Sequence, residues 1–173
     1  MTNTILHQIL SFLVLVLLQA LVLDHLDLAN GWVVPYLYVL FLIALPFDTP
    51  PWATLLAGFA TVMAMDFFTS TPGMHASACT LMAYARLWML RILAPRDGYD
   101  PIKRPTVHHM GLNWYMTYAG TLVLLHHLWL FFIEVYRFDH FFSTLLRAAV
   151  SAAATLLLCL LTQAITSREA VSR

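Results

Sequence analysis

Charged residues are scarce in this chain of 173 residues: 10% are Asp, Glu, Lys or Arg, against about 25% in an ordinary soluble domain. Nine basic and nine acidic side chains cancel, which excludes a nucleic-acid-binding protein that relies on bulk positive charge. Apolar residues make up 61% of the sequence. That balance excludes both a soluble globular domain and a disordered chain, because disorder requires low hydrophobicity and high charge.

Residues and motifs that carry catalytic or metal chemistry are also few. The two cysteines, Cys79 and Cys159, lie in apolar runs without a Cys-x-x-Cys partner and are expected to be buried small apolar residues. Eight histidines include the adjacent pairs 108–109 and 126–127, whose members point about 100° apart on a helix and so cannot chelate one ion together. The HExxH, GxSxG and P-loop motifs are absent. We therefore expect no metal, no cofactor and no catalytic residue.

Long apolar runs are what the sequence does contain. A helix that crosses a bilayer needs about 20 predominantly apolar residues, and such segments account for nearly the whole chain. The predicted fold is all-α, a polytopic membrane protein with six transmembrane helices in one domain, residues 1–173. The expected spans are residues 5–23, 32–47, 51–68, 74–93, 110–133 and 140–165. The second span is barely long enough.

Basic residues set the expected orientation, because loops that stay in the cytoplasm carry an excess of Lys and Arg. Four basic residues lie at the end of the fourth span and in the loop after it: Arg91, Arg96, Lys103 and Arg104. The opposite side carries mainly acidic residues. With six spans, both termini are therefore expected in the cytoplasm.

Ionisable side chains within a span are costly and are candidate functional residues. An outer polar cluster is expected from Asp66, His75, Glu134 and Arg147, in which Arg147 pairs with Asp66 or Glu134. Arg86 lies deeper, about 10 Å from the cytoplasmic end of its span, and is expected to snorkel to that interface. A proton or ion path is disfavoured, because the middle of the first, second and fifth spans offers almost no polar group.

Two spans carry small residues at helical spacing, which let helix backbones approach closely in a bilayer. They are Ala53, Ala57, Ala60 and Ala64 in the third span, and Ala148, Ala152 and Thr155 in the sixth. Each stripe can pack against neighbouring spans of this chain or receive a single-span partner, and the sequence leaves both readings open.

Several segments resemble the MreD family, small integral membrane proteins of the bacterial cell-elongation machinery (the elongasome). They are PYLYVLFLIALPFDTP (35–50), MDFFTSTPGMHASA (65–78), LAPRDGYDP (93–101) and FIEVYRFDHFFSTLLRAAVSAAATLLL (132–158). The stretch from Asp66 to His75 is the most specific part of the likeness.

The resemblance implies a non-enzymatic subunit of the bacterial inner membrane that supports lateral peptidoglycan synthesis, cell wall growth and rod shape. The implied partners are an MreC-like single-span protein and, indirectly, the MreB filament and the SEDS glycosyltransferase with its class B penicillin-binding protein. A homodimer is compatible with it as well. The implied fold is similar to that of the S-components of ECF-type vitamin transporters.

The alternative is a substrate-capturing, S-component-like subunit of a small-molecule transporter. Such a subunit needs an outward-facing pocket. Six polar residues near the outer boundary are candidates to line it: Asp24, Asp27, Asn30, Asp66, His75 and Glu134. A membrane enzyme is the least favoured reading.

Overall fold

The computed structural model describes residues 2–69, 73–100, 103–135 and 140–171, and within them the side chains of 6–66, 73–100, 103–135 and 140–166. The described residues form helices and no named strand, which confirms the all-α prediction. In chain order the helices are α1 (Thr2–Leu21), the 3-10 helix η1 (Leu23–His25), α2 (Val39–Ile43), α3 (Pro51–Thr69), α4 (Met74–Ile92), α5 (Val107–Met110), α6 (Leu112–Val135) and α7 (Phe141–Val171).

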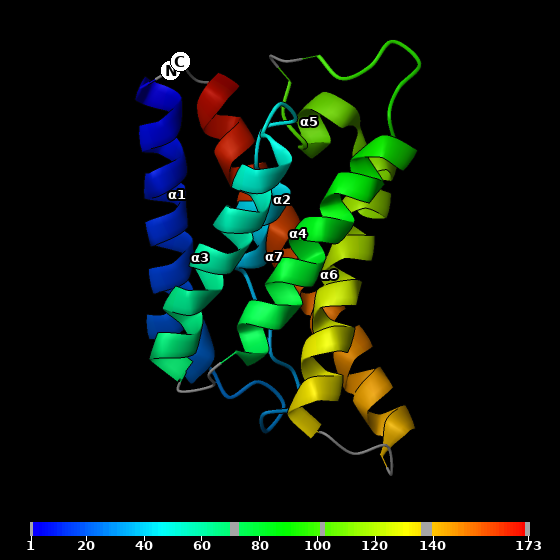
Figure 1. The fold of residues 1–173 in the computed structure, drawn as a ribbon. Coiled ribbons are helices and arrows are strands. Elements are labelled where there is room, and N and C mark those ends of the chain that lie inside the picture. The colour runs from blue at the N-terminus through cyan, green and yellow to red at the C-terminus, as the bar shows by residue number, and fades with distance from the viewer. Residues whose placement is uncertain (1, 70–72, 101–102, 136–139, 172–173) are drawn as a thin grey trace.

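Five long helices run along a common bundle, and the short helix α2 lies in its middle (Figure 1). The beginning of α1 and the end of α7 lie at the same end of the bundle, together with α5 and the connection that follows α4. Helices α3 and α4 pack closely, since a Cβ on Gly58 would lie 3.0 Å from the Cβ of Ala83.

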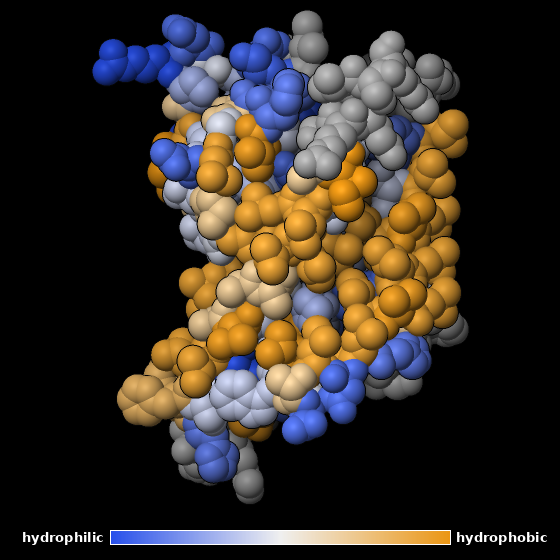
Figure 2. Space-filling model, turned by 180° about the vertical axis from the view of Figure 1, so that it is seen from behind, coloured by the Kyte–Doolittle hydropathy of each residue, from blue (hydrophilic) through white to orange (hydrophobic). Residues whose placement is uncertain are grey.

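Within the described residues, three helices are long and apolar enough to cross a membrane: Leu6–His25, Leu112–Val135 and Phe141–Thr166, with mean hydropathies of 2.3, 1.5 and 2.0. The rear face of the molecule shows a broad band of hydrophobic side chains between hydrophilic ends (Figure 2). This arrangement is typical of a membrane protein, in which apolar side chains face lipid.

Several helix ends agree with the sequence prediction. Helices α3 and α4 begin at residues 51 and 74 as expected, α3 with a proline in its first position and α4 after Gly73 in the left-handed conformation (φ 86°). The two cysteines, Cys79 and Cys159, are free and buried, as predicted.

The prediction of a continuous helix over residues 32–47 is wrong. Residues 33–38 are non-helical, and α2 has only five residues, Val39–Ile43. Pro35 explains part of the break, because a proline disfavours the helical conformation of the residue before it and supplies no N–H. The non-helical segment 33–38 enters from the end of the bundle opposite the start of α1 and leads into α2 (Figure 1).

Candidate functional site

The non-helical segment 33–38 takes its hydrogen bonds from side chains of distant helices. The N–H of Leu37 donates to Oε1 of Gln19 on α1 (2.7 Å), and Nε2 of Gln19 donates to the carbonyl of Pro35 (3.0 Å). The N–H of Tyr36 donates to the hydroxyl of Thr155 on α7 (3.0 Å). A buried backbone without such partners would be strongly destabilised in a bilayer.

Tyr38 links two histidines in the interior of the bundle. Its hydroxyl lies 3.0 Å from Nδ1 of His75 on α4 and 3.0 Å from Nε2 of His126 on α6. Tyr38 and His126 are fully buried, and Nδ1 of His126 has no hydrogen-bond partner in the part of the chain that the structure describes. A buried N–H without an acceptor is costly. We therefore assign the proton of His126 to Nε2, so that Tyr38 accepts from His126 and donates to His75.

His127 has a tautomer fixed by its neighbours. Its Nδ1 lies 2.8 Å from the carbonyl oxygen of Val123, which only accepts, so Nδ1 carries the proton. Its Nε2 then accepts from the hydroxyl of Thr155 (3.0 Å), which also receives the N–H of Tyr36. The ring of Tyr36 lies 5.4 Å from that of His127. We call Tyr36, Tyr38, His75, His126, His127 and Thr155 the buried polar network.

This network was not predicted from the sequence. Almost no polar group was expected in the middle of the second and fifth spans, but the buried Tyr38 lies within the former, and the buried His126 and His127 lie within the latter. Each sits in an apolar run, and the adjacent histidines were weighed only as metal ligands. A usable signal was present in Tyr36 and Tyr38, which lie one and three positions after Pro35. Among the described residues, no group of three His, Cys, Asp or Glu side chains is arranged to hold a metal.

The predicted outer polar cluster divides into separate interactions. Arg147 forms the expected ion pair with Glu134, with Nη1 and Oε1 3.5 Å apart. The same guanidinium lies 4.6 Å from the centre of the Phe131 ring and donates to the carbonyl of Gly31 (3.3 Å). Arg147 therefore ties α7 to α6 and to the connection before the non-helical segment.

Asp66 caps a helix instead of pairing with Arg147. Its carboxylate accepts from the backbone N–H groups of Gly73 (2.9 Å), His75 (3.2 Å) and Ala76 (3.3 Å) at the start of α4. A carboxylate at this position satisfies free donors and complements the helix dipole. Thr71 and Pro72, from the segment that most resembles MreD, lie outside the described residues.

Arg86 does not snorkel, and that prediction is wrong. The side chain is only 1% exposed. Its Nη2 donates to the carbonyls of Leu45 (2.6 Å) and Pro46 (3.1 Å), just beyond the end of α2. These carbonyls, and the negative end of the dipole of α2, hold the guanidinium inside the bundle. Nε and Nη1 of Arg86 have no hydrogen-bond partner among the described residues.

A cluster of aromatic side chains anchors the connection after α4, at the end of the bundle where α1 begins (Figure 1). Tyr99 stacks on Phe47, with ring centres 4.2 Å apart, and its hydroxyl donates to the carbonyl of Leu90 (2.9 Å). Trp114 donates to the carbonyl of Leu93 (3.1 Å). Burial raises the pKa of the Tyr99 hydroxyl above its ordinary value.

The stripes of small residues on α3 and α7 differ in how far they are buried. Ala148, Ala152 and Thr155 on α7 are buried inside the bundle. On α3, Ala53, Ala57 and Ala64 are half-buried and Ala60 is exposed. The α7 stripe therefore serves packing within the chain, whereas part of the α3 stripe remains open.

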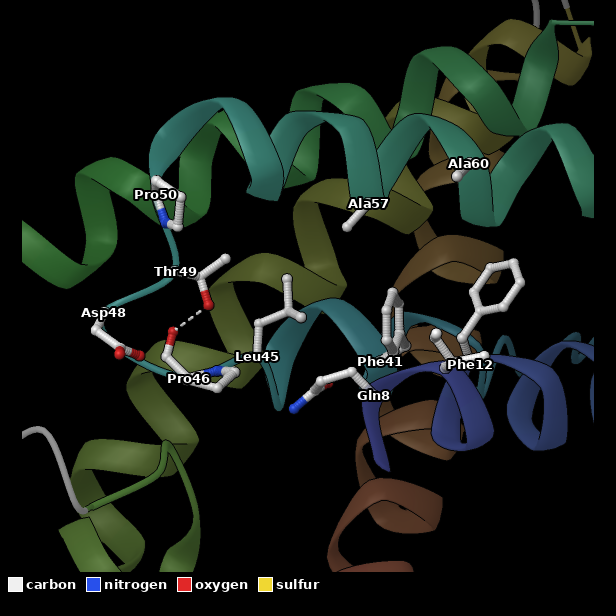
Figure 3. Close-up of a pocket in the computed structure, with 11 residues that line it drawn as sticks. Gln8, Phe12, Phe41, Leu45, Pro46, Asp48, Thr49, Pro50, Ala57 and Ala60 are labelled. Atoms are coloured by element: carbon white, nitrogen blue, oxygen red, sulfur yellow. Dashed lines mark hydrogen bonds between the residues drawn. The ribbon is translucent and has the colours of Figure 1, made fainter. Parts of the chain in front are cut away.

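A groove of about 570 Å³ lies between α1 and α3, and Ala57 and Ala60 of α3 line one side of it (Figure 3). Phe41 of α2 and residues of the segment 45–50 line it as well. A smaller cavity of about 230 Å³, at the other end of the bundle, is lined by Trp32, Val135, His140, Ser143, Thr144 and Arg147. None of the six residues expected to line a substrate pocket lines either cavity.

Comparisons with protein-family models, with curated proteins and with solved structures gave no match for this chain.

Proposed function

We propose that this chain is a non-enzymatic membrane subunit of the bacterial cell-elongation machinery, and that it works by holding an MreC-like single-span protein. The observation that carries the proposal is a contrast between the interior and the surface. The polar groups of the interior bond within the chain, whereas a groove at the surface is open to another molecule. Groups of the buried polar network bond to one another or to the backbone. The larger of the two cavities lies between two helices at the surface of the bundle.

The proposed topology has six crossings, with α1, the segment 33–46, α3, α4, α6 and α7 each crossing once. Fourteen residues in a continuous helix would reach only about 21 Å, short of the roughly 30 Å of a hydrocarbon core. A non-helical residue can add up to about 3.3 Å. The break at 33–38 therefore lets a short segment cover nearly the required distance.

The proposed location is the bacterial inner membrane, with both termini in the cytoplasm. The basic connection after α4 lies at the same end of the bundle as the beginning of α1 and the end of α7. The positive-inside tendency puts that end in the cytoplasm.

The test is co-expression of the tagged chain with the MreC-like protein of the same organism, followed by purification in mild detergent. We expect the two to co-purify through size exclusion, and cells depleted of the chain to become round. Normal rods after depletion, with no co-purified partner, would overturn the proposal.

The S-component-like carrier remains the second candidate because of one observation. Transporters often build substrate sites from discontinuous spans, and the segment 33–46 is discontinuous. Native mass spectrometry of the purified chain tests this candidate. A retained small molecule at one copy per chain would favour it over the partner-binding role.

A further inference from the structure

We infer that the groove between α1 and α3 receives the transmembrane helix of the partner, and that Asp48 pairs there with a basic residue at the cytoplasmic end of that helix. This inference rests on the proposed function and identifies the surface that performs it.

The groove offers a helix both space and close approach. Ala57 and Ala60 point from α3 across the space toward Phe12 of α1 and Phe41 of α2 (Figure 3). Small side chains allow the backbones of two helices to approach, whereas a lipid chain gains nothing from them. The α7 stripe is closed by the bundle itself, so α3 provides the small face that another chain can reach.

The groove also carries a charge at one end. Asp48 is exposed there, and it forms no hydrogen bond or ion pair with any described residue. The neighbouring Thr49 hydroxyl is occupied, because it donates to the carbonyl of Pro46 (2.8 Å). Asp48 lies at the end of the bundle that we place in the cytoplasm, where single-span proteins carry Lys or Arg. The carboxylate and such a residue have complementary charges.

Gln8 adds a polar contact within the apolar wall. It lies half-buried on α1 among the groove residues and forms no hydrogen bond with any described residue. An amide in this position can bond across to a polar side chain of a docked helix. Asp48 and Gln8 together make the groove more specific than an apolar surface that lipid covers.

The experiment is a charge exchange in the co-expressed complex. Asp48→Arg should reduce the co-purified MreC-like protein about tenfold, because like charges then face each other. Replacing the partner's cytoplasmic-end basic residue by Glu should restore the complex with Asp48→Arg and weaken it with the parent. Asp97→Arg is the matched control, since Asp97 is an exposed carboxylate in the connection after α4, outside the groove.

A second pair of variants tests the small face. Ala60→Leu fills the groove and should also release the partner, whereas Ala149→Leu, at an exposed position of α7, should not. Size exclusion of each variant alone verifies that it still folds.

The outcomes separate this inference from the proposed function. If the parent binds its partner and Asp48→Arg and Ala60→Leu bind equally well, the groove is not the interface and the inference is wrong. If Asp48→Arg loses the partner and the Glu variant of the partner does not restore the complex, the proposed ion pair is wrong. Variants that keep the partner but lose a co-purified phospholipid would show that lipid occupies the groove. If the parent itself binds nothing, the proposed function fails.

Discussion

Arg86 donates a hydrogen bond of 2.6 Å to the carbonyl oxygen of Leu45, and this bond joins the interior of α4 to the end of α2. Helix α2 has five residues, too few to be stable alone. Arg86 binds carbonyls at its end, and Tyr118 donates to the carbonyl of Ile43 (3.2 Å). Side chains of α4 and α6 thus hold the short helix in place.

Arg86→Leu should lower the free energy of unfolding by about 2 kcal/mol, because it leaves the buried carbonyl of Leu45 without a donor and removes one of the bonds to the carbonyl of Pro46, which also accepts from Thr49. Thermal unfolding in detergent measures the effect. Arg91→Leu is the control, since Arg91 is exposed in the last turn of the same helix. Equal stability of Arg86→Leu and the parent would mean that relief of the buried charge offsets the lost bonds.

Tyr38→Phe should cost about 1–3 kcal/mol of unfolding free energy, because His75 and His126 both lose their shared partner in the interior. Tyr84→Phe, at an exposed position, should change stability little. The same thermal measurement compares them. A Tyr38→Phe protein as stable as the Tyr84→Phe protein would indicate that the two histidines find other partners.

Gln19→Leu should destabilise the bundle by about 3 kcal/mol, because the amide bonds both the N–H of Leu37 and the carbonyl of Pro35. Gln8→Leu on the same helix removes an amide without hydrogen bonds to described residues and serves as the control. Similar unfolding temperatures for the two variants would contradict the role assigned to Gln19.

The sequence was sufficient for features that depend on local pattern. The starts of α3 and α4 follow from proline, glycine and the apolar runs. Such signals lie within a turn or two of the residue concerned, so they can be read without the fold.

The break at 33–38 could not be predicted in the same way. A short apolar run fits a buried helix and a buried irregular segment equally well. The groups that stabilise the irregular form come from far along the chain: Ser151 is 117 positions from Val34, and Thr155 is 119 positions from Tyr36. The buried position of Arg86 also depends on partners far along the chain, since the carbonyls of Leu45 and Pro46 lie 41 and 40 positions away.

Arg147 and Glu134 should contribute unequally to stability. Glu134→Gln should cost less than about 1 kcal/mol, because the pair is partly exposed, with side chains 25% and 42% accessible. Arg147→Ala should cost more, since it also loses the bond to Gly31 and the contact with Phe131. Yields of folded protein in detergent, with Arg96→Ala as a control, test this order. Equal losses for Glu134→Gln and Arg147→Ala would reduce the role of Arg147 to the ion pair.

The last prediction concerns the discontinuous crossing. Asn30 and Asp48 flank it, and six crossings require them on opposite sides of the membrane, although α2 between them has only five residues. A cysteine at Asn30 should therefore react with an impermeant maleimide from the periplasm. Cysteines at Asp48 and Asp97 should react only after the cells are opened. The native cysteines are buried and should give little background in intact cells. If Asn30→Cys and Asp48→Cys react from the same side, the segment 33–46 does not cross the membrane, and the proposed topology of six crossings is wrong.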